Sequence, residues 1–63
     1  MISEKINQLR KERKVNLDEL SSLVGMTKTG LHNALKNDDF KISVLVKIAN
    51  ALEVDIKYFF EDS

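Results

Sequence analysis

The fold of this 63-residue chain is decided by residues 16–36, NLDELSSLVGMTKTGLHNALK. Asn16 can cap a helix, and Glu19, three residues later, can reach back to complete a capping-box-like start. Apolar residues then recur at helical spacing and give the segment one apolar face: Leu17, Leu20, Leu23 and Val24. Gly25 follows at once and can adopt the left-handed backbone on which helices commonly end. A short helix over 17–24 is therefore predicted.

A second short helix follows after a tight turn. Met26 is an apolar turn residue, and Thr27 can cap a helix over 28–36. That helix would turn Leu31, Ala34 and Leu35 inward. Two short helices joined in this way cross steeply, so residues 17–36 are interpreted as a helix-turn-helix with the second helix projecting.

The remaining segments predict three further helices. The first would begin at Ser3 and bury Ile6 and Leu9. Residues 37–39, Asn-Asp-Asp, form the clearest loop signal. A fourth helix would begin near Asp39 or Ser43 with one apolar stripe, and a last short helix would be capped by Asp55. The fourth helix is expected to carry Leu45, Ile48, Ala49 and Leu52 on one stripe. The last helix is expected to be anchored by Ile56, Phe59 and Phe60, although Tyr58, Phe59 and Phe60 cannot all point inward on one short helix.

The composition favours an all-α class. The chain has no proline and two glycines, so little interrupts its helices. Sixty-three residues predict one domain, 1–63, which we expect to be a compact five-helix bundle. The absence of cysteine and the presence of one histidine predict no disulfide, no metal site and no cofactor. No apolar run approaches the ~20 residues of a membrane span and no leader peptide is apparent, so a cytoplasmic protein without a membrane partner is expected.

Charge is balanced overall but unevenly distributed. The formal net charge is zero, which by itself argues against a nucleic-acid partner. Residues 1–14, however, hold five basic and two acidic groups, a balance of +3, whereas residues 53–63 hold one basic and four acidic groups, a balance of −3. A molecule polarised in this way can still present a basic face.

The outward face of the predicted second helix is the main candidate for function. Helical spacing places five polar or basic residues there, with no carboxylate within 27–36: Lys28, Thr29, His32, Asn33 and Lys36. Such groups can donate to phosphates and base edges, and an asparagine can pair with adenine through two hydrogen bonds. An ordinary solvated helix face remains the alternative interpretation.

Catalysis is not expected. His32 has two lysines as its helical neighbours, which are poor partners for a general base or a metal ligand. The chain has no glycine-rich phosphate loop and no paired carboxylates beside a plausible cleft. The prediction is a non-enzyme with no catalytic residue and no small-molecule substrate.

Four features of the sequence occur in register: LSSLVGMT from Leu20, Leu31, IANALEVD from Ile48, and Phe59. In these features the chain resembles the lambda-repressor/Cro-type helix-turn-helix family of DNA-binding domains. The resemblance implies that the third of five helices enters the major groove, while the N-termini of the second and fourth contact phosphates. By position it implies base-facing Lys28, Thr29 and Asn33, His32 and Lys36 at the groove edge, and backbone contacts from Arg10, Asn16, Thr27 and Lys41.

Two functions remain open. The leading hypothesis is a sequence-specific DNA-binding transcriptional regulator, a small repressor of phage or mobile-element type that binds double-stranded DNA as a homodimer. The dimer surface would use apolar residues beside the last two helices: Val44, Val46, Tyr58 and Phe60. The alternative is a protein-interaction or antitoxin-like module that keeps the fold without strong DNA binding, which the zero net charge, Leu17 and Asp38-Asp39 favour.

Overall fold

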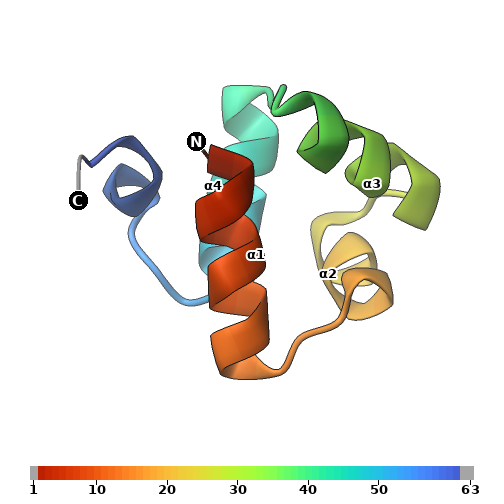
Figure 1. Cartoon of the computed structure of the whole chain (residues 1–63), viewed down its shortest axis with the longest axis horizontal. Coiled ribbons are helices and arrows are strands. Elements are labelled where there is room, and N and C mark those ends of the chain that lie inside the picture. The colour runs from red at the N-terminus through yellow and green to blue at the C-terminus, as the bar shows by residue number, and fades with distance from the viewer. Residues whose placement is uncertain (1, 62–63) are drawn as a thin grey trace.

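The computed structural model describes residues 2–61 as an all-α fold. The elements are α1 (Ile2–Arg13), α2 (Leu17–Val24), α3 (Lys28–Asn37), α4 (Ile42–Ala51) and η1 (Ile56–Phe60). In Figure 1, α1 and α4 stand between the α2–α3 pair on the right and η1 on the left. The five-helix expectation was slightly wrong, because the last element of the described residues is a short 3-10 helix. Five residues give too few i→i+4 bonds to favour a full α-helix there.

One apolar core joins all five elements. Its buried side chains come from α1, α2, α3, α4 with its C-cap, and η1: Ile6, Leu9, Leu20, Val24, Leu31, Leu45, Ile48, Ala49, Leu52 and Phe59. These are the inward residues that helical spacing predicts, and α2 packs against both α3 and α4. One expectation was wrong, because Leu23 is 62% exposed. A short helix that contacts neighbours on one side cannot bury a stripe as wide as the one in the sequence. Phe60 is 56% exposed, as expected for a residue of the proposed dimer surface.

The helix-turn-helix forms as the local signals predict. The amide N–H of Glu19 donates to Asn16 Oδ1 at 2.8 Å, and the Glu19 carboxylate accepts the Asn16 N–H in return. Gly25 ends α2 in the left-handed region with φ 72°. The Thr27 hydroxyl then accepts the N–H of Gly30 at 3.0 Å and caps α3. Residues 16–36 thus carry their own start and stop signals.

Three element boundaries differ from the expectation. Ser3 lies inside the first turn of α1 rather than in front of it. Asn37 belongs to α3, so the loop that follows begins one residue later than predicted. Helix α4 begins after Lys41, whose side chain makes no cap hydrogen bond, and neither Asp39 nor Ser43 is the cap. The carboxylate of Asp38 instead contacts Ser3 of α1.

Three helices among residues 2–61 end on left-handed residues that are not glycine. Lys14 after α1 has φ 56°, Asp38 after α3 has φ 52° and Glu53 after α4 has φ 59°. The amide N–H groups of Glu53 and Val54 donate to the carbonyls of Asn50 and Ala49, the pattern of a Schellman-type ending. Side chains with a Cβ pay about 1–2 kcal/mol for this backbone conformation, which glycine adopts freely.

Replacing Glu53 by glycine is therefore expected to stabilise the protein by about 1 kcal/mol and to raise Tm by about 4–8 °C. The measurement is thermal and urea unfolding followed by circular dichroism. Lys47→Gly is the matched control, because Lys47 is exposed in the interior of the same helix, where glycine should cost about 1 kcal/mol. Equal effects of the two glycines would contradict the strain assigned to Glu53.

Among the described residues, no helix is long and apolar enough to cross a membrane.

Candidate nucleic-acid interface

Helix α3 presents an exposed polar face. All five side chains that the sequence assigns to this face are exposed: Lys28, Thr29, His32, Asn33 and Lys36. Leu31 is fully buried on the opposite side, so the 100° step per residue places Thr29, Asn33 and Lys36 farthest from the core. The structure thus brings the predicted group onto one accessible helix surface.

Gly30 lies on the flank of this surface. A Cβ at this position would sit 3.0 Å from Thr27 Oγ1 and 3.8 Å from the methyl group of Met26. The glycine therefore leaves room for the side chain that caps α3. Its small size is explained by the N-cap of its own helix.

A carboxylate from α2 lies beside the exposed polar face of α3. Asp18 Oδ2 lies 3.6 Å from the Nζ of Lys28, and both side chains are well exposed. The pair could not be predicted from helical spacing, because Asp18 lies on α2 and outside the acid-free segment 27–36. Any phosphate that Lys28 binds must share the lysine with Asp18.

Asp18→Asn is expected to tighten DNA binding about threefold, since an exposed ion pair competes for Lys28 by about 0.2–1 kcal/mol. Titration of a labelled operator duplex at low salt measures the change, and the advantage should shrink as salt is added. Glu12→Gln is the control, because its carboxylate lies 4.0 Å from Arg13 on α1 and away from Lys28. A gain as large in the control would contradict the specific role of Asp18.

A basic groove of about 590 Å³ runs between α1 and α3. Its floor includes Leu17 and Leu35, both half-buried. Its lining also carries basic, amide and imidazole side chains and no carboxylate: Asn7, Arg10, Lys11, His32 and Lys36. Among these, Asn7 and Lys11 were not predicted as site residues. They lie four residues apart on α1, a spacing that places both on one face but does not say which helix that face meets.

Arg10 is held inside this groove by protein groups. Its Nη1 donates to the carbonyl of Val15 at 3.2 Å, and Nη2 and Nε donate to Asn7 Oδ1 at 3.0 and 3.4 Å. The guanidinium therefore fixes the turn between α1 and α2. An arginine has five N–H donors, so these contacts still leave capacity toward the groove.

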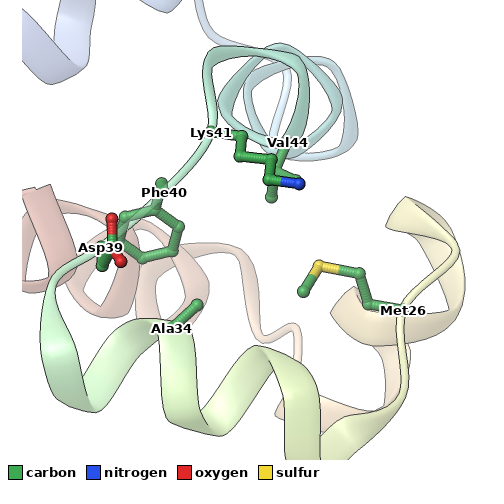
Figure 2. Close-up of a pocket in the computed structure, with 6 residues that line it drawn as sticks. All are labelled: Met26, Ala34, Asp39, Phe40, Lys41 and Val44. Atoms are coloured by element: carbon green, nitrogen blue, oxygen red, sulfur yellow. The ribbon is translucent and has the colours of Figure 1, made fainter.

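A smaller pocket lies on the other flank of α3. Figure 2 shows Met26 and Ala34 facing Phe40 and Val44 across it, with Asp39 and Lys41 at its rim. Its volume is about 290 Å³. The pocket explains why the turn between α2 and α3 carries the apolar Met26, whose side chain faces the start of α4 across it. Lys41 is exposed and extends over Val44.

The remaining candidate backbone contacts lie at helix starts. Asn16 uses its side-chain oxygen as the cap of α2, and Thr27 uses its hydroxyl as the cap of α3. Lys41 precedes α4 without capping it, which leaves early N–H groups of that helix open. Asp39 is exposed in the same loop, so a carboxylate and a lysine both line the rim of the pocket shown in Figure 2.

The four residues expected at a dimer surface divide into two pairs. Val46 is 40% exposed and Phe60 is 56% exposed, whereas Val44 and Tyr58 are half-buried. The Tyr58 ring packs edge-on against Phe59 and lies 5.4 Å from Lys5 Nζ. Ile42, one turn before Val46 on α4, is 61% exposed and was not predicted. Of the exposed large apolar residues, three therefore lie on α4 and η1: Ile42, Val46 and Phe60.

Comparison with known proteins gives one family match. A family model described as a helix-turn-helix domain matches residues 3–62. No curated protein and no solved structure matches the chain at a significant level. Residues 2–61 contain no group of three or more histidine, cysteine or acidic side chains that could hold a metal ion.

Proposed function

This chain belongs to a helix-turn-helix domain family, and we propose that it is a sequence-specific DNA-binding transcriptional regulator. The observation that carries the proposal is the exposed face of α3, which has no acidic residue of its own. The resemblance to the lambda-repressor/Cro type extends the proposal to a small repressor of phage or mobile-element type.

The proposed base contacts come from the centre of the α3 face. Thr29 and Asn33 lie farthest from the buried Leu31, so they reach deepest into a major groove in which α3 is laid. Asn33 can accept from and donate to adenine at the same time. Lys28, His32 and Lys36 flank this pair and contact groove edges or phosphates.

The proposed phosphate contacts surround α3. Lys11 and Arg10 lie in the groove on one side, and Lys41 with the open start of α4 lies on the other. Asn16 and Thr27, at the starts of α2 and α3, complete the set. These contacts position the helix without reading sequence, and their cations make the affinity depend on salt.

Selection from a random double-stranded DNA pool across a salt series tests the proposal. An enriched half-site and an affinity that falls steeply with added salt are expected. Asn33→Ala should relax the preference at one base pair of the half-site and Lys28→Ala should weaken binding, while both variants remain folded. A pool without enrichment, together with unchanged behaviour of both variants, would sink the proposal.

We further propose that the protein binds DNA as a homodimer, because one copy supplies few phosphate contacts. Ile42, Val46 and Phe60 supply the apolar surface. Val46→Glu should shift the sedimentation coefficient from dimer to monomer and weaken binding to a two-fold operator far more than binding to a half-site. Lys47→Gln, at the neighbouring exposed position, is the control, because it lowers the net charge by the same one unit. A monomeric parent protein with full operator affinity would refute the dimer.

The groove between α1 and α3 favours a second candidate function. The groove combines basic side chains with the apolar Leu17 and Leu35. An acidic amphipathic segment of a protein would contact both kinds of side chain, whereas DNA would contact only the basic ones. A protein-interaction or antitoxin-like module would use this groove. Leu35→Glu discriminates between the two: it should block such a segment through its charge on the floor, but it should leave the base preference of α3 unchanged.

A further inference from the structure

Three hydrogen-bonding contacts connect the start of α1 to the end of α3. The backbone N–H of Ser3 donates to Asp38 Oδ1 at 2.8 Å. The hydroxyl of Ser3 lies 2.7 Å from the carbonyl of Leu35 and 2.8 Å from the same carboxylate oxygen. The residues are 35 and 32 positions apart in the sequence, so the contacts join two helices that the chain does not connect directly.

Asp38 gives the first turn of α1 a cap from another helix. N–H groups at a helix start have no partner within their own helix, and a carboxylate is a strong acceptor for them. The hydrogen bond from the Ser3 N–H lowers the pKa of the Asp38 carboxyl from its usual 3.8, and the hydrogen bond from the Ser3 hydroxyl lowers it further. The carboxylate is thus charged and occupied at neutral pH.

The backbone of Asp38 adds to the case for this role. It ends α3 in the left-handed region with φ 52°, where glycine would fit with less strain. Aspartate tolerates this region better than most residues, but it brings a Cβ that glycine lacks. What aspartate adds over glycine at this position is the carboxylate that Ser3 binds.

The other end of α3 is fixed differently. Its N-terminus follows α2 across the tight turn at Gly25–Thr27, and its main helix contacts are with α2. A helix held at one end by a short turn can still tilt about that turn. Near its C-terminus, Leu35 and Asp38 supply the acceptors that bind α1.

We propose that Ser3 and Asp38 are positioning residues that fix the C-terminal end of α3 against α1 and so set the angle at which α3 meets DNA. The inference rests on the proposed DNA-binding function for its consequence, but the constraint on α3 can be measured without DNA. It also changes the role assigned to Asp38: its carboxylate holds the recognition helix, and the exposed Asp39 is the acid that repels phosphate.

Ser3→Ala tests the constraint without altering any charge. The variant loses the hydroxyl contacts, so amide hydrogen exchange at Asp38 and Asp39, whose N–H groups bond to the last turn of α3, should be about fivefold faster. Operator affinity should fall about fivefold at every salt concentration, with the slope of affinity against salt unchanged. Ser3→Thr, which keeps a hydroxyl, should restore both measurements.

Asp38→Gly and Asp39→Asn form a pair matched in charge. Each removes one negative charge from the same loop, but Asp38→Gly also removes the contact with Ser3 while keeping a residue that favours the left-handed backbone. Asp39→Asn is expected to bind the operator about threefold tighter than the parent, and Asp38→Gly to bind more weakly than the parent. Asp55→Ala, which removes a carboxylate cap from the distant η1, should leave exchange in α3 unchanged.

The outcomes test the positioning role of Ser3 and Asp38 separately from its consequence for DNA binding. Equal tightening by Asp38→Gly and Asp39→Asn, or unchanged exchange in α3 of Ser3→Ala, would overturn the positioning role. A parent protein that binds no DNA sequence would overturn the proposed function and, with it, the consequence for DNA. Faster exchange in α3 of Ser3→Ala, rescued by Ser3→Thr, would support the contact with α1 independently of that result.

Discussion

Replacing Leu31 by alanine is expected to destabilise the protein by about 3 kcal/mol. Leu31 is fully buried and is the one side chain of α3 in the buried core. A domain of this size has a total stability of about 3–9 kcal/mol, at about 0.05–0.15 kcal/mol per residue. Between a third and all of that stability would therefore be lost with one side chain, and with it the attachment of α3.

Urea unfolding followed by circular dichroism measures this loss, and it should appear as a lower midpoint with a similar slope. Leu23→Ala is the matched control from the same motif, because Leu23 is 62% exposed and its truncation should cost less than about 0.5 kcal/mol. If the two leucines cost the same, Leu31 does not anchor α3 in the way the core indicates.

The contrast between Leu31 and Leu23 shows what sequence periodicity can predict and what it cannot. Leu20, Leu23 and Val24 fit one helical stripe equally well, yet α2 is only eight residues long and packs on α3 and α4 from one side. Periodicity identifies a stripe, but the neighbouring elements decide how much of the stripe is covered. The helix ends were easier to predict, because the caps at Asn16, Gly25 and Thr27 use bonds within a few residues.

The same holds for the candidate site, in which local features were predictable and contacts between helices were not. The exposure of the α3 face follows from local spacing, and the structure has all five of its residues exposed. Contacts between helices could not be predicted in that way. The Asp18–Lys28 pair and the Ser3–Asp38 contacts depend on how three helices cross, and Asp38 alone reads as a turn residue.

Asn33→Ala is expected to weaken binding to the enriched operator by about 10- to 100-fold, the value of one bidentate base contact. The reason is the position of Asn33 on α3, opposite the buried Leu31 and beside Thr29 and Lys36. The loss should be confined to specific binding, so that affinity for unrelated DNA stays the same. Selection with the variant should also show relaxed preference at one base pair of each half-site.

Lys41→Ala supplies the contrasting result that makes this prediction specific to base recognition. Lys41 is exposed before α4 and is proposed to contact phosphate, so its loss should weaken binding to all sequences alike and reduce the salt slope by about one. Asn33 carries no charge, and its removal should leave that slope unchanged. If Asn33→Ala instead weakens all DNA equally and keeps the base preference of the parent, α3 does not read bases through Asn33. The recognition contacts would then have to come from Thr29 and the flanking lysines.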